Sequence, residues 1–331
     1  MISPKVSILM SAYNAQEYIR EAIDSILNQT FHDFEFLIIN DGSTDNSLNI
    51  IESYKDPRIR LIHNKINLGL TKSLNIGLKE ARGEYIARMD ADDISLPNRF
   101  RWQMEYMEAH PDIVLISGNI EIIDAHGNSL WKSDKVNDPD LIAWELLFHN
   151  YIGGHSQVLF RRDIALQFGG YSEDCRYSQD YDLWSRFSQK YNLAILPQVL
   201  IKWRSHEQNI STKLTSEQET ILIRQVKQQL SRLINKDVDL KLAEHLHFFW
   251  TNKFDRCGAP FVIQGALLKI VRSFARHRLI NFLSKEIPET KIRRAMAQCF
   301  LRWSKSINKY HNLVLKLLTL RLAMYWDPKM K

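Results

Sequence analysis

The sequence predicts an α/β fold in which a mostly parallel sheet is flanked by helices, followed by an α-helical C-terminal region. Over roughly the first 120 residues, short continuous apolar runs typical of buried strands alternate with segments whose apolar residues recur at helical spacing. The connections between them are short, which favours right-handed crossovers and parallel strands. Beyond about residue 212 the composition changes, and the chain becomes strongly basic.

Four strands are expected in order along the first part of the chain. They cover 5–12 (KVSILMSA), 34–40 (FEFLIIN), 59–63 (IRLIH) and 84–89 (EYIARM). Helices are expected between them, at 19–27, 43–54 and 70–81. Ser43, Thr44 and Asp45 are the candidate caps of the second helix. This alternation predicts a Rossmann-like sheet, in which ligands bind outside the carboxyl ends of the strands.

The net charge of +6 is unevenly distributed along the chain. Residues 221–331 carry 22 Lys and Arg against 7 Asp and Glu, a net charge of +15, so the preceding 220 residues carry −9. A polar stretch that is poor in apolar residues, 210–220, lies between the two parts. An acidic first part joined to a basic second part predicts two functional regions.

Composition limits the class of protein. Apolar residues make up 45% and charged residues 25% of the chain, as in globular proteins. The three cysteines (Cys175, Cys257 and Cys299) have no metal-type spacing and form an odd number, which favours a reducing compartment. The first residues read as a strand and not as a signal peptide, and no run of 18 apolar residues occurs. We therefore expect a cytoplasmic protein without a spanning helix.

Polar clusters follow three of the predicted strands: SAYN, NDGSTD and MDADD. The last places Asp90, Asp92 and Asp93 within four residues, directly after an apolar run. Like charges repel and are costly to bury unless a cation or a polar ligand offsets them. Because the chain has neither a G-x-G-x-x-G after the first strand nor a P-loop, a diphosphate would be held by Mg²⁺ or Mn²⁺ on carboxylates. The alternative is an ordinary acidic turn in which Asp93 caps the next helix.

Four segments, in this order, resemble the family 2 nucleotide-sugar glycosyltransferases. They are VSILMSAYNAQEYIREAIDSILNQTF, LIINDGSTDNS, NLGLTKSLNIGLKEARGEYIARMDADD and YSQDYDLWSRF, and the resemblance covers roughly residues 5–211. It implies a GT-A fold over residues 1–212, with a nucleotide-binding half at about 1–120 and an acceptor half at about 121–212. Residues 213–331 would form a separate, basic helical region.

The resemblance implies a nucleotide site built from the first half of the chain. Ser11 and Tyr13 match the segment that contacts the nucleobase, and Asp41 matches the carboxylate that accepts from the uracil ring or the ribose. Lys72 is the candidate phosphate contact, because Leu74 stands where many members carry an arginine. The simpler alternatives are an edge aromatic for Tyr13, a turn residue for Asp41 and a solvated helix residue for Lys72.

The resemblance also implies a metal site. Asp90 and Asp92 match the DxD motif; Asp92 would bind the Mn²⁺ or Mg²⁺ that bridges the two phosphates, and Asp90 would face the ribose or the metal. In KWRSHEQNIS, His206 would be a third metal ligand and Arg204 a partner of the leaving diphosphate. A purely structural histidine is the alternative for His206. Arg88 is expected to be a structural partner of the carboxylates.

The acceptor side is expected in the second half. Asp180, in SQDYDLWSRF, matches the general base that removes the proton from the acceptor hydroxyl, although Gln179 stands where an acidic residue is common. The alternative for Asp180 is a charge in the first turn of a helix whose apolar face continues through Tyr181 and Trp184. His155, in GGHSQ, would line the acceptor site.

Together these residues imply an inverting, metal-dependent transferase. It would move a sugar from a nucleoside-diphosphate sugar, a UDP-sugar foremost, to a hydroxyl of a growing surface glycan such as lipopolysaccharide, capsule or exopolysaccharide, free or lipid-linked.

A non-catalytic nucleotide-sugar-binding or interaction protein is the main alternative; it would keep Tyr13 and Asp41 but have no use for Asp180. A nucleotidyltransferase would normally show an early glycine-rich phosphate loop. No nucleic acid is expected as a partner, because the acidic first part repels phosphates. Association into homo-oligomers is left open.

The basic region predicts a peripheral contact with the inner face of the cell membrane. Segment 265–277 has an apolar helical face and a basic one, formed by Leu267, Ile270, Val271 and Phe274, and by Lys269, Arg272 and Arg276. The apolar segment 313–326 would reach about 21 Å as a helix, too short to span, and would place Tyr325 and Trp326 at headgroup depth. The alternative is a helical bundle with solvated charges.

Overall fold

The computed structural model describes residues 3–175, 177–207, 209, 216–282, 288–306 and 313–327. The chain divides into two compact units. The sheet unit comprises Met1–Pro139 and Ile152–Thr215, and the helical unit comprises Asp140–Tyr151 and Ser216–Lys331. The segment 140–151 lies inside the acceptor half expected at 121–212, yet it groups with the helical unit.

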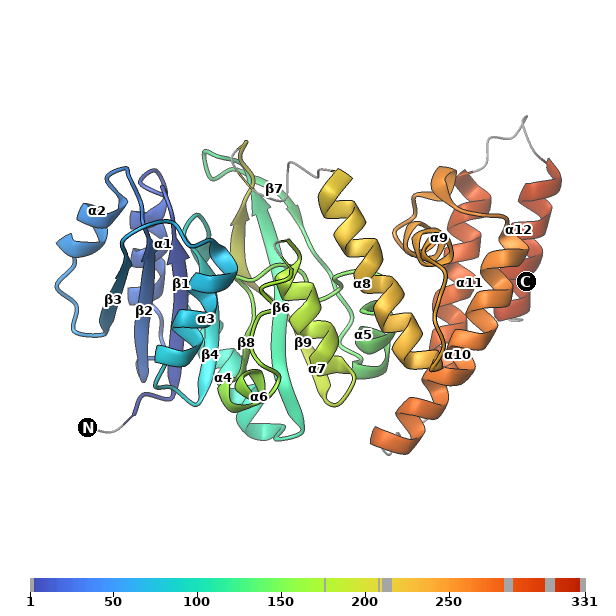
Figure 1. The fold of residues 1–331 in the computed structure, drawn as a ribbon, viewed down its shortest axis with the longest axis horizontal. Helices are drawn as coiled ribbons and strands as arrows, with labels where there is room; N and C mark the ends of the chain where they lie inside the picture. Colours follow the sequence, from blue (N-terminus) through green and yellow to red (C-terminus); the bar gives the residue numbers. More distant parts are fainter. Residues whose placement is uncertain are drawn as a thin grey trace. The chain divides into compact units, whose positions relative to one another are not determined.

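The sheet unit is built around one mixed sheet (Figure 1). Within the described residues its nine strands lie in the order β3-β2-β1-β4-β8-β6-β9-β5, with β7 beside β6. The first four strands along the chain pair in parallel, as do β6 and β9, whereas β5, β7 and β8 run antiparallel to their neighbours. The strands are β1 (Val6–Ala12), β2 (Phe34–Asp41), β3 (Ile59–Asn64), β4 (Tyr85–Asp90), β5 (Ile94–Ser95), β6 (Ile113–Ile123), β7 (Ser129–Lys132), β8 (Leu159–Arg161) and β9 (Asn192–Arg204).

The predicted α/β architecture is confirmed, and β1 to β4 match the predicted strands to within one residue at each end. Every residue of β2 is buried, which explains its continuous apolar run, since helices cover parallel sheets on both faces. The N-cap of α2 is Asn46 and not one of the three predicted residues. Asp45 lies just before it, and its Oδ1 accepts from the N–H of Ser47, 2.9 Å away. The helices of this unit are α1 (Ile19–Leu27), α2 (Ser47–Ser53), α3 (Leu70–Glu80), α4 (Arg99–Ala109), α6 (Arg162–Gln167) and α7 (Gln179–Ser188).

The helical unit has a core to which the segment 140–151 contributes. Trp144 is fully buried, and its ring centroid lies 5.2 Å from Phe148, 5.6 Å from Trp250 and 5.3 Å from Phe274. Trp144 therefore packs against helices that follow it by more than 100 residues. The elements of this unit are most of α5 (Pro139–Glu145), then α8 (Ser216–Ile234), α9 (Leu240–Trp250), η1 (Phe254–Arg256), α10 (Pro260–Phe282), α11 (Pro288–Ser306) and α12 (Leu313–Trp326).

The apolar face predicted for 265–277 is buried within the helical unit. Its four apolar residues are at most 3% exposed, whereas Lys269, Arg272 and Arg276 are exposed. Trp326, expected at headgroup depth, is 1% exposed, and Tyr325 is 50% exposed. This packing matches the bundle alternative for the segment 265–277 and leaves its basic side chains exposed for a membrane contact. None of the helices in the described part of the chain is long and apolar enough to cross a membrane.

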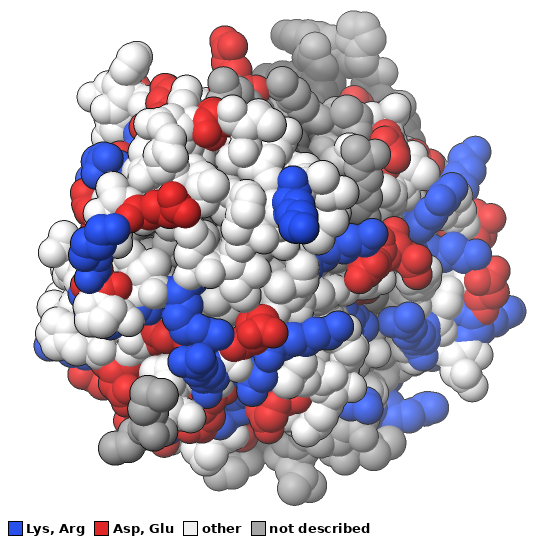
Figure 2. Space-filling model, turned by 60° about the vertical axis from the view of Figure 1, so that its left-hand side comes forward, with Lys and Arg blue, Asp and Glu red and all other residues white. Residues whose placement is uncertain are grey.

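The surface carries charges of both signs. On the face drawn in Figure 2, Lys and Arg side chains lie next to Asp and Glu side chains, mainly over the lower half and the right-hand side, and much of the upper part is uncharged. The fields of opposite charges that lie side by side largely cancel at a distance, and salt at physiological concentration screens what remains over about 8 Å. The uneven charge of the sequence is therefore not expressed on this face as one large field of a single sign.

Candidate active site

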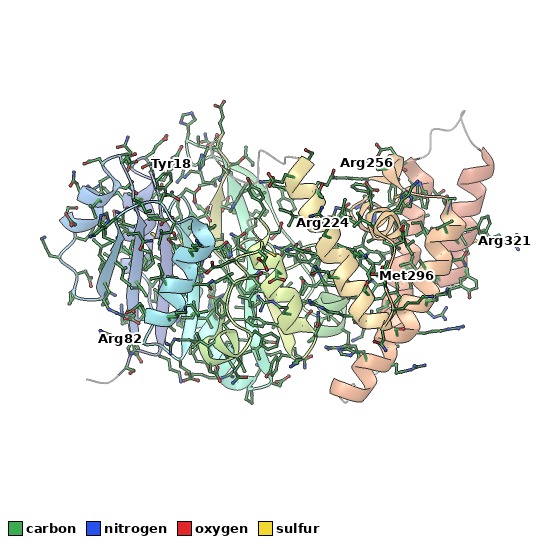
Figure 3. The ribbon with its side chains drawn as sticks, in the orientation of Figure 1. Tyr18, Arg82, Arg224, Arg256, Met296 and Arg321 are labelled. Atoms are coloured by element: carbon green, nitrogen blue, oxygen red, sulfur yellow. The ribbon has the colours of Figure 1, made fainter. Side chains whose placement is uncertain are left out.

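Polar residues meet at the carboxyl edge of the sheet because β1, β2 and β4 are parallel. Ser11 of β1 lies in register beside Asp90, the last residue of β4. Figure 3 shows Tyr18, which follows β1, at this edge and Arg82, which precedes β4, at the opposite edge. The predicted clusters after β1 and β2 touch directly, since Asn14 Oδ1 accepts from the N–H of Thr44 at 2.8 Å.

Asp90 is held by a buried arginine and a serine. Arg88 is fully buried on β4 and donates to Asp90 Oδ1, and Ser156 Oγ donates to Asp90 Oδ2 at 3.1 Å. Burial acts to raise the pKa of Asp90, but the charges of Arg88 and His155 and these hydrogen bonds outweigh it and hold the pKa below its ordinary value. The expected partnership of Arg88 with the carboxylates is confirmed. Ser156 could not be singled out from the sequence.

Asp92 faces His206. Asp92 Oδ2 lies 3.0 Å from His206 Nε2 and 3.4 Å from Asn209 Nδ2, and the ring of His206 packs against Tyr18 with centroids 5.1 Å apart. Burial and the charge of Asp90 raise the pKa of Asp92, and the bond to His206 offsets this only in part. In the described residues, no three His, Cys, Asp or Glu side chains converge closely enough to hold a metal ion by themselves. The structure thus brings together two of the predicted ligands, and an ion here would need further ligands from a substrate.

Arg204 is almost wholly enclosed, at 3% exposure. Its Nε donates to the carbonyl oxygen of Asp92 at 3.0 Å, its Nη1 donates to the carbonyl oxygen of Ala125 at 3.1 Å, and its Nη2 pairs with the carboxylate of Glu21. The guanidinium also stacks over the ring of Tyr18 at 4.6 Å. Contact with a leaving diphosphate, as expected from the sequence, would require Arg204 to release some of these partners. In this structure it clamps the turn that carries Asp92.

Asp93 supports this clamp from the other side. It is 1% exposed, and its Oδ1 accepts from the backbone N–H of Arg204 at 2.9 Å. Burial, together with the charges of Asp92 and Asp90, raises the pKa of Asp93 well above its ordinary value. Because α4 begins only at Arg99, Asp93 does not cap that helix, and its role is the supporting one.

Asp41 is buried and organises a neighbouring loop. Its two carboxylate oxygens accept from Asn64 Nδ2 and from the backbone N–H groups of Leu68 and Gly69, each at 2.9 Å. The loop passes close to Gly42 (φ +69°): a Cβ atom at position 42 would lie 2.4 Å from the backbone of the loop. At 2% exposure, Asp41 could touch a nucleobase or ribose only by sharing or giving up these donors.

The remaining nucleotide-site candidates lie at the surface. Tyr13, two residues after Ser11, is 49% exposed just beyond the end of β1. Lys72 is exposed in the first turn of α3. Both are accessible to a ligand at the carboxyl edge, but the structure does not bring either of them into contact with the carboxylates.

On the acceptor side, Asp180 lies in the first turn of α7 and His155 is buried at 8% exposure. The ring centroid of His155 lies 5.6 Å from that of Tyr171 and 6.3 Å from that of Trp184. Burial and the charge of Arg88 lower the pKa of His155. Tyr171 was not predicted. Its only sequence signal is the preceding Gly-Gly pair, whose φ angles of +78° and +71° make a sharp turn.

Comparison with known proteins shows to which family the chain belongs. Residues 7–168 match the model of Glycosyl transferase family 2. An uncharacterized glycosyltransferase of Haemophilus influenzae is 32% identical over 296 residues, which cover 85% of this chain and 90% of that protein. The chain belongs to glycosyl transferase family 2. The amylovoran biosynthesis glycosyltransferase AmsE of Erwinia amylovora is 34% identical to this glycosyltransferase over 204 residues, 60% of this chain and 76% of that protein.

Solved structures confirm the expected GT-A fold of this glycosyltransferase. Residues 1–349 of TarS from S. aureus, in complex with UDP-GlcNAc, align with a TM-score of 0.60 at 16% identity, over 98% of this chain and 92% of that chain. The mannosyltransferase PcManGT from Pyrobaculum calidifontis, in complex with GDP-Man and Mn²⁺, aligns with a TM-score of 0.53 at 15% identity, over 98% of this chain and 87% of that chain.

Proposed function

We propose that this glycosyltransferase moves a sugar from a nucleoside-diphosphate sugar, a UDP-sugar foremost, to a hydroxyl group of a growing surface glycan, with inversion at the anomeric carbon. The observation that carries the proposal is the meeting of Asp90, Asp92 and His206 at the carboxyl edge of the sheet, where α/β folds bind their ligands. The UDP-GlcNAc bound to TarS and the GDP-Man bound to PcManGT support a nucleotide-sugar donor.

Asp92 and His206 would hold a Mn²⁺ or Mg²⁺ ion, with Asp90 beside them. The donor set fits, because carboxylate oxygen and imidazole nitrogen suit Mn²⁺, and because the side chains of Asp92 and His206 are 27% and 11% exposed and leave coordination positions for phosphate oxygens. The Mn²⁺ in the PcManGT complex supports this assignment. When bound, the ion stabilises the negative charge that develops on the leaving diphosphate. Arg204 and Asp93 keep the carboxylate turn in place.

Asp180 would act as the general base. It takes the proton from the acceptor hydroxyl while that oxygen forms the new bond to the anomeric carbon. The bond between this carbon and the diphosphate oxygen breaks on the opposite face, so the configuration inverts. A base of this kind contributes about 10² to 10⁴ in rate. His155 would line the acceptor site, and Tyr13, Ser11 and Lys72 would contact the nucleotide.

The acceptor is proposed to be a glycan under construction, free or lipid-linked, in lipopolysaccharide, capsule or exopolysaccharide. A relative named for amylovoran biosynthesis supports this class. Contact of the helical unit with the inner face of the cell membrane belongs to the same proposal. Exposed basic side chains, Lys269, Arg272 and Arg276 among them, would carry this contact, since the apolar face of α10 is already packed.

The test is a donor screen that measures nucleoside diphosphate release from UDP-, GDP- and dTDP-sugars, with a panel of saccharide acceptors, with and without Mn²⁺. For the donor that is found, Asp180→Asn should lose transfer by about 10²-fold or more while calorimetry shows near wild-type donor binding. Asp163→Asn, which alters an exposed carboxylate in the first turn of α6, is the matched control and should keep wild-type transfer.

Two outcomes would contradict the proposal. If donor binding by Asp180→Asn falls in parallel with transfer, Asp180 is structural and the assignment of the base fails. If the wild-type chain binds a donor but transfers to no acceptor, and Asp180→Asn behaves identically, the chain is a nucleotide-sugar-binding protein.

A further inference from the structure

Three buried aromatic rings lie against one another in the sheet unit, and we call them the aromatic triangle: His155, Tyr171 and Trp184. Their ring centroids are separated by 5.6 Å (His155 to Tyr171), 6.3 Å (His155 to Trp184) and 6.3 Å (Tyr171 to Trp184). The three residues come from the segment after α5, the turn after α6 and helix α7. They are 8%, 1% and 0% exposed.

Each ring carries a buried polar atom that lacks a hydrogen-bond partner. In the described part of the chain these atoms are His155 Nε2, Tyr171 Oη and Trp184 Nε1. A buried polar group without a partner is destabilising, and such groups are rare in folded proteins. Internal water molecules are normally found where two to four such groups face a common space. Here three such atoms lie on rings that contact one another.

The aromatic triangle is connected both to Asp90 and to Asp180. His155 is followed by Ser156, which accepts from the backbone N–H of Asp90 at 2.9 Å and donates to its carboxylate at 3.1 Å. Trp184 lies four residues after Asp180 on α7, so the two side chains occupy the same helix face one turn apart. The charges of Asp90 and Asp180 both act on His155.

Tyr171 is fixed by helix α3. Its backbone N–H donates to Asn75 Oδ1 at 2.9 Å, and Asn75 Nδ2 donates back to its carbonyl oxygen at 2.8 Å. Gly170 permits this clamp, because a Cβ there would lie 2.7 Å from Asn75 Oδ1. The charges of Asp90 and Asp180 act on Tyr171 as they do on His155. The backbone of Tyr171 is thus fixed to α3, and its ring lies within electrostatic reach of both Asp90 and Asp180.

We propose that the aromatic triangle encloses an internal water molecule and sets the position of Asp180 relative to Asp90. His155, Tyr171 and Trp184 are then positioning residues for the transfer step, and this inference rests on the proposed role of Asp180. The donor is bound on the Asp90 side and the acceptor hydroxyl on the Asp180 side. Because a displacement of about 1 Å between reacting groups can cost on the order of 10²-fold in rate, the spacing of these two carboxylates decides the transfer rate.

The central test is Tyr171→Phe, which removes only the hydroxyl and keeps the ring. If Oη is hydrogen-bonded to an internal water, the variant loses that bond, and the melting midpoint falls by roughly 2 to 4 °C. The kcat for transfer should fall by about 5- to 20-fold with an unchanged KM for the donor, because donor binding does not use the triangle. Tyr54→Phe is the matched control: its hydroxyl donates to Asp24 at 2.7 Å, outside the site, and kcat should stay at the wild-type value.

Two further measurements complete the test. His155→Gln, which can still reach the water, should keep more transfer activity than the apolar His155→Leu. A high-resolution crystal structure of the full chain should show a water within hydrogen-bond distance of at least two of the three polar atoms. A higher melting midpoint for Tyr171→Phe, as expected from removing a hydroxyl without a partner, together with wild-type kcat, would overturn the inference. Full transfer by Asp180→Asn would instead overturn the proposed function itself.

Discussion

Asp90, Asp92 and Asp93 are neighbours on the chain, but each carboxylate has a different surrounding. Arg88 and Ser156 hold the pKa of Asp90 below its ordinary value, while burial raises that of Asp92 and, much further, that of Asp93. Asp93 is therefore the group of the three most readily protonated. A single divalent ion can offset the negative charge of the cluster.

The metal assignment predicts the effect of Asp92→Asn. The substitution keeps the volume of the side chain but removes the charge that would hold Mn²⁺, so transfer should fall by at least about 10²-fold while the circular dichroism spectrum stays that of the wild type. Nucleoside diphosphate release measured across a Mn²⁺ titration checks this. Full turnover by freshly purified wild-type protein in excess EDTA would refute the assignment.

The enclosed position of Arg204 predicts that it acts on the metal site through Asp92. Arg204→Ala should weaken apparent Mn²⁺ affinity by roughly 10- to 100-fold, as is typical when a residue that orients a metal ligand is lost. Arg204→Lys should not restore it, because an ammonium group cannot make the three divergent contacts of the guanidinium. A Mn²⁺ titration of transfer gives the affinity. Loss of UDP binding in the absence of metal would show direct diphosphate contact instead.

The parts of the site that are local in sequence could be predicted, and the parts made by distant segments could not. The spacing of Asp90 and Asp92 after a strand is compatible with a cation site or with an acidic turn, and the polar clusters after the neighbouring strands favour the site. The burial of Asp41 depends on Asn64 and the loop that follows it, and that of Arg204 on Glu21 and the turn at Ala125. Such partners cannot be read from a motif, so the sequence overstates the accessibility of both residues.

At the scale of whole elements, prediction succeeds where an element buries its apolar side against its near neighbours. Strands β1 to β4 are found where their apolar runs indicate. Helix α5 is different: Trp144 is fully buried, but against Trp250 of α9 and Phe274 of α10, which come more than 100 residues later. Nothing in the local pattern of α5 shows that it packs with those helices, and the structure groups residues 140–151 with the helical unit.

The buried His247 of helix α9 leads us to expect that the stability of the helical unit depends on pH. His247 is 5% exposed, its Nδ1 bonds the carbonyl oxygen of Phe148 at 2.8 Å, and burial lowers its pKa to about 4. The ordinary pKa is about 6.5, so the unfolded chain takes up the proton first as the pH falls. The contribution of neutral His247 is present above pH 6.5 and is lost between about pH 6.5 and pH 4, by up to roughly 3 kcal/mol.

Denaturant unfolding at several pH values checks this expectation. The difference in free energy of unfolding between wild type and His247→Gln should shrink as the pH falls from 7 to 4, because only the wild type carries the depressed pKa. His110→Gln, at an exposed position of the sheet unit, is the control and should follow the wild-type profile. A difference that does not vary with pH would refute the role of His247.

At the scale of the whole molecule, the proposed membrane contact predicts a dependence on the exposed charges of α10. Replacing Lys269, Arg272 and Arg276 by Glu should reduce co-sedimentation with anionic vesicles at low salt by at least about tenfold, since each well-placed basic residue contributes roughly 1 kcal/mol. The matched control, with the same change in net charge, reverses three exposed basic residues of the sheet unit: Lys65, Lys79 and Arg101. Equal binding by both variants would favour the bundle without a membrane role.

The shared core around Trp144 has a consequence for how this enzyme can be divided or recombined. The chain passes from one unit to the other at three places, after Pro139, Tyr151 and Thr215. A cut after Thr215 would leave Trp144 and Phe148 without their partners, each costing about 1.5 to 3 kcal/mol on exposure to water. The helical unit can therefore be exchanged between relatives only if residues 140–151, which lie between the two segments of the sheet unit in the sequence, are exchanged together with residues 216–331.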